Sequence, residues 1–244
     1  MRRGFTLTEL LVVIALIVIM SGLSAPAIRA YLLNREQTLA VRVFSGAVSN
    51  AQALARAHFT TTAVRVERAF ATDDSGRMLR NPAGRPYWLD HQKIQILAVG
   101  MHQPQKPVAG EALVFRRLLD APAVDLPSSA WLAPGNALSL LASGNTTYQP
   151  SAAGATAIDT LDTFYLVFNR QGTLVRLPAS RLVYLDESQD NAFIEHPQPS
   201  QMGAITYNRG RFEKSGRDPT WLEKGIPLYI NQRTGSVIGA HASR

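Results

Sequence analysis

The chain has 244 residues, of which 46% are hydrophobic and 18% are charged, and its formal net charge is +7 at pH 7. This length and apolar content allow one substantial buried core and leave room for an insertion. The moderate charge does not form the dense Lys/Arg stripe of a dedicated nucleic-acid-binding protein. The chain has no cysteine, which excludes disulfide bonds and cysteine-based metal sites and leaves packing as the source of stability.

The first 28 residues combine a short basic leader with a long apolar run. From Phe5 to Ile28 the run has 24 residues, and Glu9 is its only charge. A membrane-spanning helix needs about 20 predominantly apolar residues, so this segment is long enough to cross a bilayer. A carboxylate within such a helix costs about 2.5 kcal/mol or more, so we expect a partner that neutralises Glu9.

The pattern Gly4-Phe5-Thr6-Leu7-Thr8-Glu9 before the apolar run resembles the class III signal of type IV pilins and of the pseudopilins of type II secretion. In that family a membrane-embedded aspartyl prepilin peptidase cuts after the glycine and methylates the new amino terminus. The resemblance therefore implies that residues 1–4 are a leader peptide, that cleavage falls between Gly4 and Phe5, and that Phe5 becomes N-methylated. Removal of the leader lowers the side-chain charge from +7 to +5.

The same resemblance implies two assembly residues. Glu9 takes the place of the family's fifth-position glutamate, whose carboxylate meets the amino-terminal positive charge of a neighbouring subunit where few waters screen the pair. Pro26 lies where many pilins have a proline that removes one backbone hydrogen bond and bends the helix.

The resemblance also implies a location and a set of partners. The chain would cross the inner (cytoplasmic) membrane once, with its carboxyl-terminal bulk in the periplasm or outside the cell, and would enter a filament on assembly. Its partners would be the prepilin peptidase, the inner membrane, and other pilin or pseudopilin subunits met through the amino-terminal helix. The charges do not settle the orientation alone, because Arg2 and Arg3 precede the span while Arg29, Arg35 and Arg42 follow it.

The first 28 residues also fit a secretory signal peptide or a plain membrane anchor. Ala25-Pro26-Ala27 is similar to the small-residue cleavage site of an ordinary secretory signal peptide. Against a signal peptide, the apolar run exceeds the usual h-region of about 7–15 residues and carries Glu9 at its head. A plain single-pass anchor would not require Gly4-Phe5 directly before Thr-Leu-Thr-Glu. Both alternatives stay open.

After Pro26 the apolar residues recur three or four positions apart, which predicts an amphipathic helix. They are Ile28, Leu32, Leu39, Val43, Phe44, Val48, Ala51, Leu54 and Ala55. We therefore expect one spine helix with a transmembrane half over residues 5–28 and an amphipathic half over residues 29–58. If it is continuous, the helix is roughly 80 Å long.

Seven short segments after the helix are rich in β-branched or aromatic residues and are bounded by turn residues, which predicts strands. They are residues 62–66, 94–97, 112–115, 164–168, 181–185, 204–207 and 228–230. A sheet is the simplest surface on which the helix can bury its apolar stripe. The expected fold class is therefore α+β and pilin-like, with the long amino-terminal helix packed on an antiparallel β-sheet domain over residues 60–244.

Two turn sequences predict β-hairpins. Asn169-Arg-Gln-Gly172 connects residues 166–168 to 173–177, and Asn231-Gln-Arg-Thr-Gly235 connects residues 228–230 to 236–238. In each turn the glycine supplies the positive φ that closes the hairpin. The pair resembles the carboxyl-terminal part of H-type (FimT-like) minor pseudopilins, which implies a minor subunit. The alternative is two unrelated hairpins of a β domain.

Residues 121–158 differ in composition from the segments around them. Asp125 is their only charged residue, and four prolines interrupt a stretch rich in Ala, Ser and Gly. This composition predicts a Pro/Ala/Ser-rich insertion that forms a long surface loop. A binding role for that loop is the alternative.

The motifs of common enzymes are missing from the sequence. It has no His-Glu-x-x-His, no Gly-x-Ser-x-Gly and no glycine-rich phosphate loop. We expect neither enzymatic activity nor a cofactor. Asp73-Asp74, and Asp186-Glu187 with Asp190, offer oxygen ligands but lack the spacing and the turn glycine of a calcium loop, so we predict no metal site.

The sequence thus favours a prepilin-type subunit of a type IV pilus or a type II secretion pseudopilus, as a minor component. One alternative is a membrane-anchored protein that keeps the prepilin tag without entering a filament. Another is a DNA-binding minor pilin, because four neighbouring cations beside two aromatic residues could attract phosphates and stack on bases. The cations are Arg209, Arg211, Lys214 and Arg217. We expect instead a solvated basic loop between two strands and no nucleic-acid partner.

Overall fold

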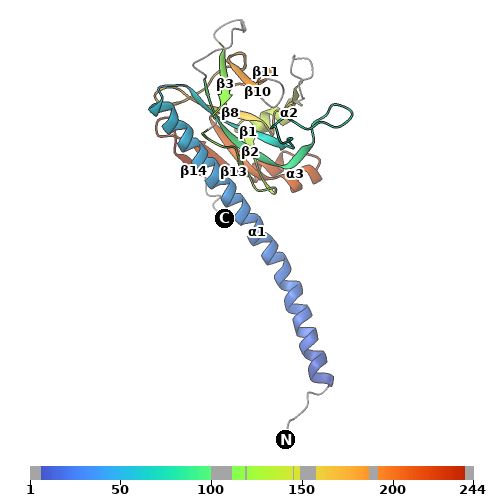
Figure 1. The fold of residues 1–244 in the computed structure, drawn as a ribbon. Helices are drawn as coiled ribbons and strands as arrows, with labels where there is room; N and C mark the ends of the chain where they lie inside the picture. The colour runs from blue at the N-terminus through green and yellow to red at the C-terminus, as the bar shows by residue number, and fades with distance from the viewer. Residues whose placement is uncertain are drawn as a thin grey trace.

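The computed structural model describes residues 7–99, 112–118, 120–144, 146–148, 158–186 and 192–239. Within these ranges the side chains of residues 23, 25–27, 29, 33, 148, 158, 186, 192, 193 and 239 are not described. A long amino-terminal helix extends from a globular β domain (Figure 1). The helix is followed by a large sheet of mainly antiparallel strands. This arrangement confirms the predicted α+β class.

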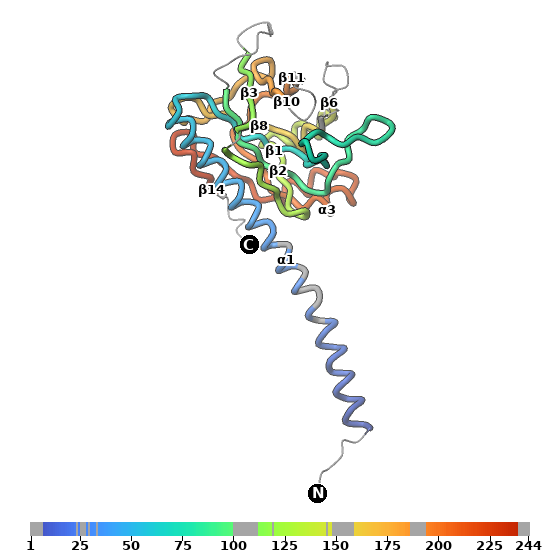
Figure 2. The backbone as a smooth tube through the Cα atoms, viewed as in Figure 1, coloured from blue at the N-terminus to red at the C-terminus, as the bar shows by residue number. Residues whose placement is uncertain are grey.

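Helix α1, Leu7–Ala57, runs without interruption along the path drawn in Figure 2. Its bounds agree with the spine helix predicted over residues 5–58. Glu9 lies in the first turn and Arg56 in the last turn, where an acid and a base complement the helix dipole. Across the part of the chain that the structure describes, no helix combines the length and the apolar character needed to cross a membrane.

The larger sheet has the strand order β11-β10-β3-β2-β1-β8-β9, with β4 paired to β2. The strands are β1 Thr62–Phe70, β2 Trp88–Val99, β3 Leu113–Arg117, β4 Val124–Asp125, β8 Phe164–Phe168, β9 Leu174–Val175, β10 Leu182–Asp186 and β11 Ala192–Glu195. One expectation is wrong: the sheet is not purely antiparallel, because β10 pairs with β3 in parallel. After β4 the chain leaves this sheet and returns to it with β8, so the parallel partner of β3 arrives by a long crossover and not by a hairpin.

A second sheet has the order β14-β13-β12-β5, and its pairs are antiparallel. Its strands are β5 Ala130–Pro134, β12 Gly203–Asn208, β13 Ile226–Ile230 and β14 Val237–Gly239. A small pair joins β6 Thr147–Tyr148 to β7 Ile158–Asp159. The short helices are α2 Ala137–Ala142, the 3-10 turn η1 Ala179–Arg181, α3 Arg209–Lys214 and α4 Thr220–Glu223. The sequence had suggested a single sheet, and the division into two was not anticipated.

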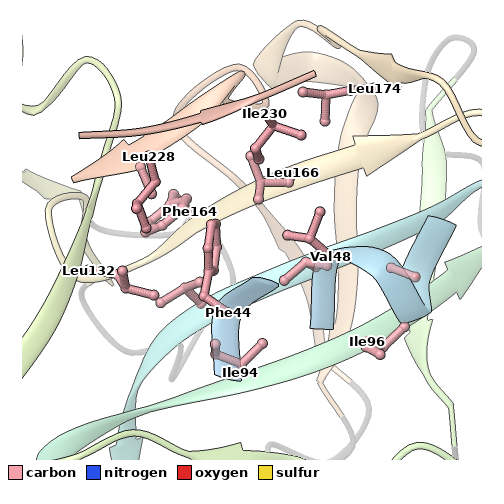
Figure 3. Packing of buried hydrophobic residues seen from close by; sticks show 14 of the residues in the cluster. Phe44, Val48, Ile94, Ile96, Leu132, Phe164, Leu166, Leu174, Leu228 and Ile230 are labelled. Atoms are coloured by element: carbon pink, nitrogen blue, oxygen red, sulfur yellow. The ribbon is translucent and has the colours of Figure 1, made fainter. Parts of the chain in front are cut away.

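The main core lies where α1 meets both sheets (Figure 3). Phe44 and Val48 of α1 are fully buried, and they belong to one apolar cluster with residues of β2, β8 and β13. The buried stripe of α1 is Ala40, Phe44, Val48, Ala51 and Ala55, a spacing of three or four residues that keeps them on one face. The predicted stripe is therefore confirmed in the carboxyl-terminal part of α1, from Phe44 to Ala55.

Three residues of the predicted stripe are not buried. Ile28, Leu32 and Leu39 are all exposed. The helical period of the sequence was right, but full burial of α1 in the domain begins only at Ala40.

The prediction of a surface loop is wrong for the middle of residues 121–158. Residues 130–134 form β5, which pairs with β12 along its whole length. Trp131 and Leu132 are fully buried, and Ala137 and Leu140 of α2 join the Trp131 cluster. A low charge content, which we took as the mark of a loop, here reflects a strand buried on both faces. Residues 145 and 149–157 of this stretch lie outside the described residues.

Both predicted hairpins are confirmed, and both turns pack against the end of α1. β8 and β9 pair around Gly172, and β13 and β14 pair around Gly235. The Gln52 side-chain amide donates to the carbonyl oxygens of Gly172 at 2.7 Å and of Arg233 at 3.2 Å. Arg56 adds bonds to the carbonyl oxygens of Gln171 and Arg233. Two side chains of the spine helix therefore hold both turns.

Candidate assembly helix and basic segment

The lower part of α1, residues 7–39, has no fully buried residue among the side chains that the structure describes, and the domain meets it only near its carboxyl-terminal end, where the Ser129 hydroxyl donates a hydrogen bond to Glu36. Its large apolar side chains are exposed around the whole circumference, from Leu7 at 79% through Val13 at 45% to Met20 at 68%. At a rise of 1.5 Å per residue this part is about 50 Å long. Figure 1 shows α1 extending beyond the domain. An apolar surface around a whole helix requires an apolar environment on every side.

Glu9 is placed at the far end of this exposed length. It lies in the first turn of α1 and is exposed. Its neighbours along the helix, Leu10 to Val13, are apolar and equally exposed. Glu9 is thus a carboxylate in an apolar section of helix, presented outward and near the amino terminus.

The other residues predicted from the amino-terminal pattern cannot be placed. Gly4 and Phe5, the expected cleavage and methylation site, lie outside the described residues. Pro26 lies within α1, but its side chain is not among those described.

The basic segment, residues 209–217, begins with the short helix α3, Arg209–Lys214, and is not the loop that the sequence suggested. Asn208 caps α3, because its side-chain oxygen accepts a hydrogen bond from the Arg211 backbone N–H at 2.9 Å. The buried ring of Phe212 lies against Tyr207, with the two ring centroids 5.2 Å apart. Phe212 therefore attaches the segment to the second core cluster.

Two of the four cations of the basic segment are paired with acids. Arg209 Nη1 lies 2.6 Å from Asp162 Oδ1, and its guanidinium carbon lies 4.1 Å from the centroid of the buried Trp131 ring. Arg217 lies 2.9 Å from Asp159 Oδ2, and both arginines also contact Glu213. These pairs attach the segment to the end of β7 and to the residues between β7 and β8.

The buried end of this network is electrostatically strained. Burial, together with the negative charge of Asp159, raises the pKa of Asp162 to about 6, and Arg209 opposes that shift. Burial also raises the pKa of the neighbouring Tyr207 phenol. An acid with few waters around it is stabilised mainly by its pair with Arg209, so Arg209 acts as a structural partner in this fold.

The remaining two cations are exposed. Among the described residues, Arg211 and Lys214 have no ion-pair partner. The residues predicted as a four-cation DNA surface therefore divide into two that are neutralised within the domain and two that face solvent. This division leaves less positive charge for phosphates than the sequence suggested.

The acidic groups considered as calcium ligands are placed only in part. Asp73 Oδ1 accepts hydrogen bonds from the backbone N–H groups of Ser75 and Arg77 and from the Ser75 hydroxyl. The Ser75 and Arg77 hydrogen bonds lower the pKa of Asp73. Its oxygens thus close a turn. Glu187 and Asp190 lie outside the described residues.

The residues that hold these elements together were not predicted from the sequence. Gln52, Arg56 and Asp162 were not singled out, because each is polar and none belongs to a motif. Gln52 is 5% exposed and falls on the buried stripe beside Ala51. A polar residue on a predicted apolar face was the available signal for Gln52, and no comparable signal marks Asp162.

The comparisons with known proteins address the amino terminus. Residues 1–25 match the family described as the prokaryotic N-terminal methylation motif. The comparisons with curated proteins and with solved structures return no match. The matched family consists of structural subunits. The chain therefore carries at its amino terminus the signature of the type IV pilins and pseudopilins.

Proposed function

We propose that this chain is cut between Gly4 and Phe5, methylated at Phe5, anchored in the inner membrane by residues 5–28, and then assembled into a type IV pilus or a secretion pseudopilus as a minor subunit. The observation that carries the proposal is the methylation motif over residues 1–25 joined to a helix whose lower part is apolar and exposed around its whole circumference. The motif supplies the processing step, and the exposed helix supplies the surface that a filament buries.

The exposed apolar part of α1 requires an apolar environment both before and after assembly. Each square ångström of apolar surface left in water costs about 25 cal/mol, so exposure of the lower part of α1 to water is strongly unfavourable. Lipid chains would cover this surface before assembly, and the helices of other subunits would cover it in the filament. The β domain, held at the other end of α1, would stay outside the bundle.

Glu9 has a specific part in this proposal. Cleavage after Gly4 creates a positively charged amine at Phe5, and Glu9 lies in the first turn of α1. The two charges are buried when the helices bundle, and a buried charge requires a partner. We therefore pair the Glu9 carboxylate of one subunit with the Phe5 amine of a neighbour.

The proposal of minor status rests on the carboxyl-terminal hairpins. Their turn sequences resemble those of H-type minor pseudopilins, and both turns are held by Gln52 and Arg56 of α1. Because both turns contact the spine helix, they belong to one structural unit. This shared attachment favours the resemblance over two unrelated hairpins.

Mass spectrometry of the amino terminus tests the processing step. The protein extracted from membranes of cells that contain a prepilin peptidase should begin at Phe5 and carry one added methyl group. The same protein from cells without the peptidase should keep residues 1–4. An intact Met1 in the presence of the peptidase, or a new terminus after Ala27, would overturn the proposal.

Shearing of surface filaments tests the assembly step. The processed chain should be recovered with the sheared filament fraction, in a small proportion relative to the major subunit. A chain that is processed but stays entirely in the membrane fraction would instead be a membrane-anchored protein that kept the prepilin tag.

A further inference from the structure

We propose that the surface of the domain next to the point where α1 emerges binds the anionic phospholipid headgroups of the membrane that anchors α1. We call this surface the headgroup face and define it as Ala30, Asn34, Gln37, Arg211, Trp221 and Lys224. The inference rests on the proposed function, because it requires residues 5–28 to lie in the bilayer. It adds a second membrane contact, made by the folded domain.

The headgroup face lines a groove. A cavity of about 290 Å³ lies between α1 and the segment that runs from β12 through α4. Ala30, Asn34 and Gln37 form its α1 side, and Arg211, Trp221 and Lys224 form its domain side. In Figure 1, α3 lies at the end of the domain from which α1 emerges. The groove therefore faces the direction in which the membrane would lie.

The groove lies at the right depth for headgroups. At 1.5 Å per residue, Ala30 is about 3 Å and Gln37 about 14 Å beyond Ile28 along the helix axis. The polar layer on each side of the hydrocarbon core is about 5–7 Å thick. If the hydrocarbon ends near Ile28, the lower part of the groove lies within the headgroup layer.

The charges of the headgroup face are available to a ligand. Across the described ranges neither Arg211 nor Lys224 has an ion-pair partner. Both approach the half-buried Trp221 ring, with the Arg211 guanidinium carbon 5.7 Å and the Lys224 ammonium nitrogen 4.7 Å from its centroid. A tryptophan with flanking cations is typical of the membrane interface, because the ring tolerates the boundary and the cations attract phosphate.

The form of the groove favours a headgroup over DNA. DNA binding uses a row of cations that follows successive phosphates, whereas the outer cations Arg209 and Arg217 are already paired with Asp162 and Asp159. Two cations beside one tryptophan, in a groove closed on one side by α1, match a single phosphate group next to a lipid surface.

The absence of cysteine from the chain allows a clean experiment. In the full chain, Thr220→Cys places one fluorophore on an exposed residue beside Trp221, and Gln171→Cys places it near Arg56 at the far end of α1. Each labelled protein is reconstituted into nanodiscs of phosphatidylcholine, alone or mixed with phosphatidylglycerol, that contain a headgroup-linked quencher. Quenching measures how much of the time the labelled surface lies on the membrane.

We expect stronger quenching of the label at residue 220 when phosphatidylglycerol is present, a decrease of that quenching with added salt, and no lipid dependence at residue 171. Each cation near an anionic surface changes binding about fivefold. The double change Arg211→Gln with Lys224→Gln should therefore weaken docking about 25-fold. The matched double change Arg117→Gln with Arg170→Gln removes two exposed charges elsewhere and should have no effect. Equal unfolding midpoints would show that the variants keep the fold.

Three results would overturn the inference. Equal quenching with and without phosphatidylglycerol, in a chain that resists carbonate extraction from vesicles, overturns the headgroup face and leaves the membrane anchor intact. A chain that does not insert into these lipids overturns both proposals. Salt-sensitive binding of a DNA duplex that depends on Arg211 and Lys224, without any effect of phosphatidylglycerol, identifies a DNA site instead.

Discussion

The two halves of α1 belong to one helix, yet they are buried in different ways. From Ala40 to Ala55 one residue in three or four is buried in the domain, and the residues between them are polar or partly exposed. From Leu7 to Met20 the apolar side chains are exposed on all sides. A single apolar stripe is satisfied by one partner within the chain, whereas an apolar circumference requires lipid or other helices. The comparison shows that the pattern of apolar residues, more than their number, tells where a helix is buried.

The largest expected effect concerns the half of α1 that is packed in the domain, from Ala40 to Ala55. Phe44→Ala should lower the free energy of unfolding of the domain by about 3–5 kcal/mol, because it leaves a cavity where a fully buried ring now packs. Denaturant unfolding of the detergent-solubilised full chain, followed by tryptophan fluorescence, measures this loss.

Leu16→Ala is the matched change in the lower half. Leu16 is 54% exposed, so the unfolding free energy of the domain should change by less than about 0.5 kcal/mol. Equal effects at the two positions would mean that the halves are not separate in the way the comparison requires.

The next effect is the pH dependence of the free energy of unfolding of the domain. Burial lowers the pKa of His196 to about 4 from an ordinary value of 6.5. The unfolded chain therefore binds more protons than the folded chain between about pH 4 and pH 6.5. Acidification through this window should reduce the free energy of unfolding by up to about 3 kcal/mol through the protonation of His196.

Asp162 has the opposite effect on the pH dependence of stability and therefore provides the control. Its pKa is raised from 3.8 to about 6, so the folded chain binds the extra proton and its contribution is lost as the pH rises from about 4 to 6. Asp162→Asn should therefore steepen the loss of stability on acidification, and His196→Gln should reverse its slope. Unfolding midpoints near pH 4.5 and pH 7 measure both slopes, and parallel slopes in the two variants would contradict the assignment.

A smaller loss of stability is expected where the hairpin turns contact the carboxyl-terminal end of α1. Gly235→Ala should cost about 2–3 kcal/mol, because the residue has a positive φ and an added Cβ would collide with the Gln52 amide. Gly144→Ala is the matched control, with a similar φ of 67° and open space around the added atom. It should cost only about 1 kcal/mol. If the two substitutions prove equal in thermal unfolding, Gln52 does not hold the turn closely.

The smallest expected effect on the domain belongs to Glu9→Val. The unfolding free energy of the domain should not change, since Glu9 lies at the exposed end of α1. Membrane insertion should persist, because the span becomes more apolar, while recovery of the chain in sheared filaments should fall sharply. Unimpaired recovery would refute the pairing of Glu9 with a neighbouring amine.

Local patterns predicted local structure well. The apolar run and the helical period that follows it predicted α1 to within two residues at each end, and the glycine turns predicted both hairpins. These features depend on residues close together in the chain, where spacing and backbone preference decide the outcome. The loop prediction was wrong for residues 130–134 because a strand buried on both faces has no alternation of polar and apolar residues to reveal it.

The candidate site likewise has one part that the local sequence reveals and one part that depends on distant residues. The processing motif lies within six consecutive residues and is visible in the sequence alone. The division of the basic segment is not visible there, because Arg209 is paired with Asp162, 47 residues away.

The sequence by itself determined the long helix, its apolar lower half, the processing motif and the two turns, because each is written in neighbouring residues. Only the tertiary structure decided that the buried stripe of the helix begins at Ala40 and that Gln52 and Arg56 join both turns. It also decided that Arg211 and Lys224 stay exposed while Arg209 is half-buried against Asp162. Burial and charge pairing depend on which distant segments meet, and no local pattern records that choice.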